Sequence, residues 1–208
     1  MTARHVVVDL GGVLFPFDHA HRLHRLSAAF GLSPERVDEA LWTSGFSADC
    51  DRGVHATAAE VRSGIRAATG FTGSDETLDT EWCSAFRPDR AVAAELLGRT
   101  PQPVLFTNNG PLEEEVLTRL YPEMFEGFGR LVFSHRIGHR KPEAAAFAAV
   151  TELLGARPGD VLLIDDSLRN TEAARAFGWD AVHYRGPRSL HGAGPGQGPP
   201  DRSPTRTS

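Results

Sequence analysis

The 208-residue sequence has no apolar run that approaches the about 18 residues needed to cross a bilayer. Its N-terminal apolar run is interrupted at Asp9 and is too short for the core of a secretory signal. Only two cysteines occur, Cys50 and Cys83, and they form no C-x-x-C pair, which is typical of proteins from a reducing compartment. We therefore expect a cytoplasmic protein without membrane contact, in which both thiols are reduced.

The sequence also lacks an excess of positive charge. Its formal net charge is -5 at pH 7, which argues against a surface that binds nucleic acid or anionic lipid. Hydrophobic residues make up 40% and charged residues 24% of the chain, as in an ordinary globular protein. The length allows one domain, or one domain that carries an insertion. We expect a small molecule or a protein as the partner, while the composition leaves the oligomeric state open.

Five short apolar segments are typical of buried strands in a parallel sheet. Four of them end in polar residues, and helical segments, several closed by glycine, lie between the later ones. This alternation predicts an α/β fold, a Rossmann-like parallel sheet flanked by helices. The strand segments are Val6–Asp9, Val104–Thr107, Leu131–Ser134, Val161–Asp165 and Ala181–Tyr184.

Residues 15–88 break this alternation, because they carry helix signals and no convincing strand. Ser33 precedes Pro34 as a helix N-cap, and Thr57 with Glu60 forms a capping box. We therefore expect a core made of residues 1–14 and 89–186, with a small α-helical cap, residues 15–88, inserted after the first strand. Residues 187–208 are rich in Gly, Pro, Ser and Arg, and we expect them to form a disordered tail.

The polar strand ends are the candidate functional site. In an open parallel sheet, ligands bind beyond the carboxyl ends of the strands, so these residues should meet in one crevice. Taken singly, each has a structural interpretation, as a turn residue, a helix cap or a solvated lysine. Their order along the chain favours a shared function. The residues are Asp9, Thr107, Asn108, Lys141, Asp165 and Asp166.

The same four segments resemble, in order, the motifs of the haloacid dehalogenase-like (HAD) hydrolase superfamily, most of whose members are phosphatases. The first motif is a strand ending in D-x-D-G-[TV], here VVVDLGGVL, and the second is a strand ending in Thr or Ser, here VLFTNNG. The third is a lysine before a helix, here GHRKPEAAAF, and the fourth is a strand ending in two acids, here VLLIDDSLRN. The resemblance covers residues 5–185 and is closest to the D-x-G-[GN]-[VI] subgroup, which includes sugar-1-phosphate phosphatases.

The resemblance implies a phosphatase that acts on a small phosphorylated metabolite, such as a sugar phosphate, through an aspartyl-phosphate intermediate. It gives the role of nucleophile to Asp9, since a carboxylate can form such an intermediate. Cations and hydrogen-bond donors must then offset the charge of the phosphate. This role falls to Lys141, the Thr107 hydroxyl, the Asn108 amide and the turn amides of Leu10 and Gly11.

The resemblance also implies a bound Mg²⁺, which prefers oxygen ligands. It places the direct ligands at an Asp9 oxygen, the Gly11 carbonyl and Asp166. Asp165 is an additional or water-mediated ligand, and Asn170 orders the loop.

The sequence departs from the usual phosphatase pattern at Gly11, where the family normally carries an acid. Its absence slows the departure of a poor leaving group. An anomeric phosphate needs less assistance, and Asp18 or His19 could substitute. Two alternatives stay open: a 2-haloacid dehalogenase, which needs neither this acid nor Mg²⁺, and a catalytically inactive binding protein. The acid pair Asp165–Asp166 favours the phosphatase, because these carboxylates repel one another without a cation.

The cap offers fewer signals. Arg52 lies in a D/E-R-G segment like that of the subgroup and is expected either to reach substrate on closure or to be solvated. A closing cap selects small substrates. The spacing of His19, His21 and His24 puts them on different helix faces, which argues against a zinc site. We expect four aromatic residues to pack in the cap core: Trp42, Phe46, Trp82 and Phe86.

Overall fold

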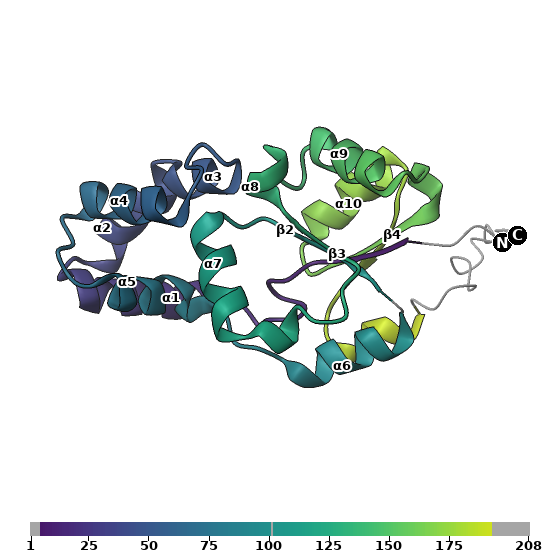
Figure 1. Cartoon of the computed structure of the whole chain (residues 1–208), viewed down its shortest axis with the longest axis horizontal. Coiled ribbons are helices and arrows are strands. Elements are labelled where there is room, and N and C mark those ends of the chain that lie inside the picture. Colours follow the sequence, from purple (N-terminus) through teal and green to yellow (C-terminus); the bar gives the residue numbers. More distant parts are fainter. Residues whose placement is uncertain (1–4, 101, 193–208) are drawn as a thin grey trace, which may run out of the picture.

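The computed structural model describes residues 5–100 and 102–192. It consists of a sheet flanked by helices and a bundle of helices at one end of that sheet (Figure 1). The predicted α/β fold class, a Rossmann-like parallel sheet flanked by helices, is confirmed.

The sheet contains five parallel strands in the order β3-β2-β1-β4-β5. The first strand, β1, lies in the middle and pairs with both β2 and β4, so the chain order reverses on either side of it. Ligands bind at such a reversal point in open α/β sheets. The strands are β1 (His5–Val8), β2 (Val104–Thr107), β3 (Arg130–Phe133), β4 (Val161–Asp165) and β5 (Asp180–His183).

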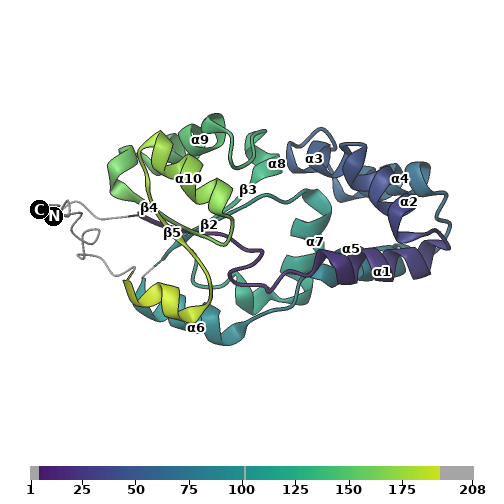
Figure 2. The same cartoon turned by 180° about the vertical axis from the view of Figure 1, so that it is seen from behind.

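Helices cover both faces of the sheet, as Figures 1 and 2 show. Successive strand residues point to opposite faces, so Val6 and Val8 pack on the side of α6 (Arg90–Arg99) and α7 (Pro111–Leu120). Val7 packs on the other side, against α9 (Ala144–Leu154) and α10 (Leu168–Phe177). Short helical turns complete the core: α8 (Ser134–Ile137), η3 (Pro122–Met124) and η4 (Pro158–Asp160).

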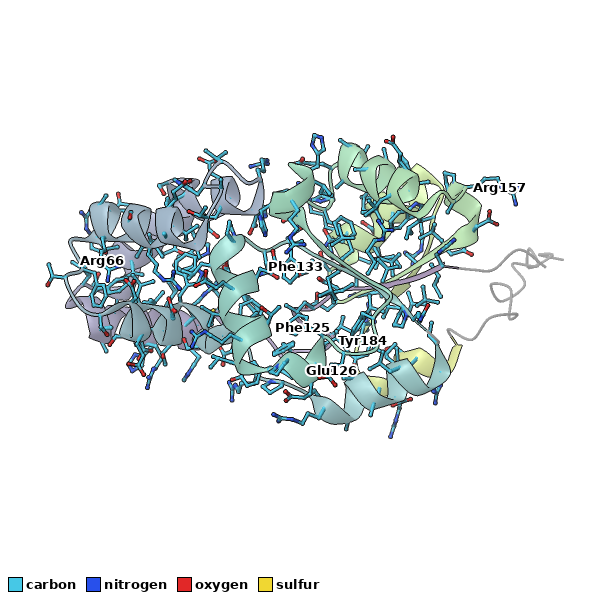
Figure 3. All side chains as sticks on the ribbon, viewed as in Figure 1. Arg66, Phe125, Glu126, Phe133, Arg157 and Tyr184 are labelled. Carbon is cyan, nitrogen blue, oxygen red and sulfur yellow. The ribbon has the colours of Figure 1, made fainter. Side chains whose placement is uncertain are left out.

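An aromatic cluster beneath the sheet edge supports the turn that follows β1. The rings of Phe15 and Phe125 lie 6.2 Å apart, and those of Phe125 and Phe133 lie 6.4 Å apart. Figure 3 shows Phe125 and Phe133 in the interior, whereas Arg157 points into solvent at the end away from the cap. The fully buried Phe15 donates its amide to the Leu10 carbonyl and accepts from the Gly12 amide, so the cluster fixes this turn.

The predicted helical cap is a bundle in which α5 lies beside α1 (Figure 2). Ser33 and Thr57 cap their helices as predicted, each accepting a backbone hydrogen bond from the residue three positions on. The cap elements are α1 (His19–Phe30), α2 (Pro34–Asp38), η1 (Glu39–Thr43), α3 (Phe46–Asp51), α4 (Ala58–Thr69), α5 (Asp75–Trp82) and η2 (Cys83–Ala85).

The two chain segments that join cap and core run side by side. Phe17 and Phe86 form an antiparallel bridge, and the Asp18 amide donates to the Ala85 carbonyl at 3.0 Å. The cap also rests on α7, where Arg62 binds both Asp79 of α5 and Glu115 of α7.

The C-terminal boundary differs from the prediction. Residues Pro187–Gly192 form a short helix, η5. Its Leu190 is buried, and the Leu190 carbonyl accepts a hydrogen bond from Arg99 at 3.3 Å. One apolar side chain is enough to dock this polar segment beside α6. The rest of the predicted tail, 193–208, lies outside the described residues.

Cys50 and Cys83 are free and buried, as expected. No helix in the described part of the chain is both long and apolar enough to traverse a bilayer.

Candidate active site

The carboxyl ends of three neighbouring strands bring the predicted polar residues together. Asp9 follows β1, Thr107 ends β2 and Asp165 ends β4. They lie beneath a pocket of about 270 Å³ between core and cap. The predicted residues that line it are Asp9, Gly11, Thr107, Asn108 and Asp166.

Lys141 is the only lysine in the sequence, and its side chain is completely buried. Its Nζ lies 3.0 Å from Asp9 Oδ1 and 2.6 Å from Asp165 Oδ2, and it donates to the Phe106 carbonyl at 2.8 Å. Burial alone would lower the pKa of Lys141, but the charges of Asp9 and Asp165 raise it above its usual value. The ammonium is therefore a fixed positive charge beneath the site.

Asp9, which the resemblance predicts to be the nucleophile, is 8% exposed. Burial raises its pKa to about 7, helped by the charges of Asp165 and Asp166 and opposed by Lys141. Asp9 Oδ1 accepts a hydrogen bond from the Leu10 amide at 2.8 Å. Leu10, predicted to bind substrate through this amide, therefore orients Asp9 in this structure, and its side chain is fully buried.

Asp165 is completely enclosed by hydrogen-bond donors. Its Oδ1 accepts from the Ser167 amide at 2.8 Å, and Asn170 donates to both carboxylate oxygens at 3.1 Å. Its Oδ2 also accepts from Lys141. Asp165 thus positions Lys141 and the loop after β4, with Asn170 ordering the loop as predicted, and its lone pairs are already engaged.

Asp166 approaches the Gly-Gly turn closely. A Cβ at Gly12 would lie 1.9 Å from Asp166 Oδ2, and Gly12 has φ +74°. Only glycine tolerates both the left-handed backbone and this contact. Burial raises the pKa of Asp166, and the neighbouring charge of Asp165 adds to the effect.

These carboxylates fit a divalent cation. One oxygen from each of Asp9, Asp165 and Asp166 lies within 4.8 Å of the others. Three carboxylates face one ammonium, so their mutual repulsion adds to burial in raising the pKa values of Asp9 and Asp166 against the opposing charge of Lys141. An all-oxygen site with excess negative charge is the donor set that Mg²⁺ prefers. Lys141, Ser167 and Asn170 already donate hydrogen bonds to both carboxylate oxygens of Asp165. The side chains best placed to bind the cation directly are therefore Asp9 and Asp166.

The loop after β2 links to the lysine loop through Asn108. The Asn108 side-chain Nδ2 donates to the Lys141 carbonyl at 2.8 Å, and its Oδ1 accepts from the Lys141 backbone amide at 2.9 Å. The Thr107 hydroxyl donates to Asn109 Oδ1 at 2.6 Å, and the Asn109 amide donates to Ser134 Oγ. Sequence reasoning missed Asn109 and Ser134, which hold this loop in place.

The upper wall of the pocket comes from the cap and its linkers, and the sequence did not predict most of it. Trp42 and Phe86, expected to pack in the cap core, line the pocket. Trp42 stacks on the buried Trp82 with ring centroids 5.3 Å apart. Phe46 is half-buried near His55 and does not line the pocket. The wall residues that were not predicted as site residues are Phe17, Arg22, Ser47, Asp51, Glu113 and Arg140, although Asp51 and Arg140 lie within segments that resemble the family.

Arg22 is held in an aromatic box. Its guanidinium carbon lies 4.6 Å from the ring centroid of Trp42, 5.1 Å from that of Phe17 and 5.6 Å from that of Trp82. It contacts His19 Nδ1 at 2.9 Å, while its Nε has no hydrogen-bond partner. Burial lowers the pKa of Arg22, but arginine stays protonated at neutral pH.

Three further charged groups, Asp51, Glu113 and Arg140, line the pocket. Asp51 ends α3 and lies 3.6 Å from Arg140, in the loop before α9. Glu113, on α7, is buried, and its Oε2 has no hydrogen-bond partner. Burial raises the pKa of Asp51 to about 7, and the charge of Glu113 adds to the effect.

The structure does not bring Arg52, Asp18 or His19 to this pocket. Arg52 donates to Glu143 at 2.7 Å and lines a separate cavity beside Arg140. Asp18 caps α1 through the His21 amide. The histidines His19, His21 and His24 belong to no group close enough to share an ion among the described residues.

A parallel α/β core that gathers carboxylates and a buried lysine beneath a helical cap defines an enzyme fold with its site at the carboxyl edge of the sheet. The chain matches the family of haloacid dehalogenase-like hydrolases over residues 3–178, and it belongs to this family.

Solved structures agree in fold. The HAD family enzyme BT-2542 from Bacteroides thetaiotaomicron aligns with a TM-score of 0.78 and 24% identity, over 92% of this chain and 98% of that one. Its complex with magnesium and inorganic phosphate aligns with a TM-score of 0.71 and 25% identity, over 86% and 92% of the two chains. L-2-haloacid dehalogenase from Xanthobacter autotrophicus aligns with a TM-score of 0.60 and 17% identity, over 91% and 81%. The comparison with curated proteins finds no match.

Proposed function

We propose that this hydrolase is a Mg²⁺-dependent phosphatase of a small phosphorylated metabolite and that Asp9 is its nucleophile. The observation that carries the proposal is the cluster of Asp9, Asp165 and Asp166, whose oxygens lie within 4.8 Å of one another around a single ammonium. A dehalogenase that works without metal has no use for this surplus of negative charge. The complex of BT-2542 with magnesium and inorganic phosphate also supports a Mg²⁺-dependent phosphatase.

The chain's own residues perform most of the reaction. Lys141 holds Asp9 Oδ1 at 3.0 Å, which fixes the carboxylate at the floor of the pocket. The Asp9 oxygen attacks phosphorus, and the bond to the ester oxygen breaks, leaving an aspartyl-phosphate that water then hydrolyses. Asp9 and Asp166 would hold Mg²⁺, which when bound neutralises charge on the transferring phosphoryl group.

The pocket favours a small polar substrate. Its volume of about 270 Å³ lies between the strand ends and the cap. Aromatic rings of Phe17, Trp42 and Phe86 form part of the wall, while Arg22 and Glu113 offer a donor and an acceptor. These features suit a leaving group with an apolar face and hydroxyl groups, such as a sugar. Arg52 is a candidate for substrate contact only if its ion pair with Glu143 opens.

The experiment that tests this function is hydrolysis of 4-nitrophenyl phosphate by the purified protein with Mg²⁺ and with EDTA. The nitrophenolate leaving group needs no proton, so Gly11 cannot mask the activity. We expect turnover that requires Mg²⁺ and disappears in Asp9→Asn, whereas the exposed control Asp49→Asn on α3 keeps it. Halide release from a 2-haloacid in EDTA, with no phosphate release, would instead establish the dehalogenase.

A further inference from the structure

The missing acid at position 11 leaves a chemical role unfilled. Gly11 has no side chain, and a Cβ there would face the rings of Phe17 and Phe86 at 3.8 Å. A poor leaving group departs from phosphorus about 10²–10⁴-fold faster when a positioned acid protonates it. If the chain is a phosphatase, as proposed above, another residue must lie on the leaving-group side of the phosphoryl group.

The direction of attack says where that residue must lie. In an in-line displacement the leaving oxygen is on the side of phosphorus opposite the nucleophile. Asp9 is at the floor of the pocket, so the leaving oxygen points toward the cap. The described cap residues that line the pocket between the two linkers are Arg22, Trp42, Ser47 and Asp51.

Of these four, only Asp51 can exchange a proton near neutral pH. Arginine stays protonated, the indole of Trp42 is a donor only, and the serine hydroxyl does not ionise in this range. The two substitutes suggested by the sequence, Asp18 and His19, do not line the pocket. Asp18 is engaged by the His21 amide and by Arg87.

The surroundings of Asp51 keep it partly protonated. The side chain of Asp51 is 12% exposed, and its carboxylate lies 3.6 Å from the Arg140 guanidinium. Burial and the charge of Glu113 raise its pKa to about 7, against the opposing charges of Arg140, Arg22 and Arg52. Other charged side chains of the elements packed on α3 are bonded elsewhere: His135 and Arg136 to Glu114, and Glu39 to Arg36.

We propose that Asp51 is the general acid and base of the reaction, supplied by the cap in place of the residue missing at Gly11. In the first step the electron pair of the breaking P–O bond stays on the ester oxygen, which takes the proton of the Asp51 carboxyl and leaves as an alcohol. In the second step the Asp51 carboxylate takes a proton from water as that water attacks the aspartyl-phosphate. The Asp9–phosphorus bond then breaks, and Asp9 carboxylate and inorganic phosphate are released.

The test compares two esters of similar shape, 4-nitrophenyl phosphate and phenyl phosphate, in the presence of Mg²⁺. Phenol is a far weaker acid than 4-nitrophenol, so only phenyl phosphate needs a proton donor. The parameter is kcat/KM, which reports the steps up to release of the phenol. We expect Asp51→Asn to lower kcat/KM for phenyl phosphate by about 10²-fold or more and for 4-nitrophenyl phosphate by less than about tenfold.

The retained turnover of 4-nitrophenyl phosphate shows that the variant is folded. The matched control Asp49→Asn lies on the same helix, is exposed, and should change neither value. Equal losses for both esters in Asp51→Asn, or no loss for either, would overturn the role of Asp51. Failure of the wild-type protein to hydrolyse either ester would instead contradict the proposed phosphatase.

A second measurement uses Glu113, whose charge raises the pKa of Asp51. Because the acid must be protonated, kcat/KM of the wild type for phenyl phosphate should fall as pH rises through about 7. Glu113→Gln should move the midpoint of this fall to lower pH, whatever it does to the magnitude of kcat/KM, because Glu113 also lines the pocket. A fall at unchanged pH in Glu113→Gln would contradict the assignment to Asp51.

Discussion

The Lys141 ammonium lies 2.6 Å from Asp165 Oδ2, and both side chains are completely buried. The pair joins the loop before α9 to the end of β4, beneath Asp9. A charge removed from such a buried group leaves its partners uncompensated.

Replacement of Lys141 by methionine should therefore destabilise the protein by about 3–5 kcal/mol at pH 8. The loss should shrink toward pH 5, since the carboxylates left without their partner can then take up protons. Urea unfolding in EDTA at both pH values measures this. Arg157→Met, which removes an exposed partner of Asp160, is the control, and an equal cost in the two variants at pH 8 would contradict the prediction.

Magnesium should stabilise the folded chain, because it offsets the surplus charge of Asp9, Asp165 and Asp166. At a Mg²⁺ concentration about 100 times its Kd, we expect about 2.7 kcal/mol of stabilisation, a rise in Tm of roughly 5–10 °C. Asp166→Asn should abolish most of this rise, while Asp49→Asn should keep it. Thermal unfolding with Mg²⁺ and with EDTA gives the comparison, and a full Mg²⁺ response in Asp166→Asn would exclude Asp166 as a ligand.

Gly12→Ala should lower the free energy of unfolding by far more than a Gly→Ala substitution at a left-handed glycine normally does. The matched control is Gly70→Ala, because Gly70 has nearly the same φ, +72° against +74°, but open space where the Cβ would be. The control reports backbone strain alone, about 1 kcal/mol. The clash with Asp166 should add to this in Gly12→Ala and should also remove the thermal shift with Mg²⁺. Equal free energies of unfolding for the two variants would show that the approach of Asp166 has no cost.

The raised pKa of Asp51 predicts a pH dependence of stability. The folded protein holds this proton up to about pH 7, whereas the unfolded chain releases it near pH 4, so the stabilisation present below pH 4 is lost as pH rises to 7. Asp51→Asn should remove this loss and gain stability over the wild type between pH 4 and 8, by at most about 4 kcal/mol. Denaturant unfolding at a series of pH values, with Asp49→Asn in parallel, measures the difference. A constant difference across the pH range would contradict it.

The sequence predicts the residues at the strand ends well, because the signals that identify them are local. Each polar residue directly follows a short apolar strand, and parallel strands bring their carboxyl ends to one edge. Asp9, Thr107 and Asp165 therefore meet as expected. The finer roles depend on contacts between distant segments: Asp165 is engaged by Lys141, 24 residues away along the chain, which no spacing rule indicates.

Most of the upper wall of the pocket could not be predicted from the sequence. Asp51, Glu113 and Arg22 come from three helices, and their meeting depends on how the cap packs on α7. The same dependence governs Arg52, which pairs with Glu143, 91 residues further along the chain. At the C-terminus, Leu190 docks in the core although its neighbours read as a polar tail.

The solitary lysine gives this protein a built-in reporter. Lys141 is the single ε-amino group of the sequence and lies at the centre of the site. Lysine labelled with ¹⁵N would therefore yield one ammonium resonance, free of overlap. That signal would follow the ionisation of Asp9 and the arrival of a cation or phosphate, without any substitution in the chain.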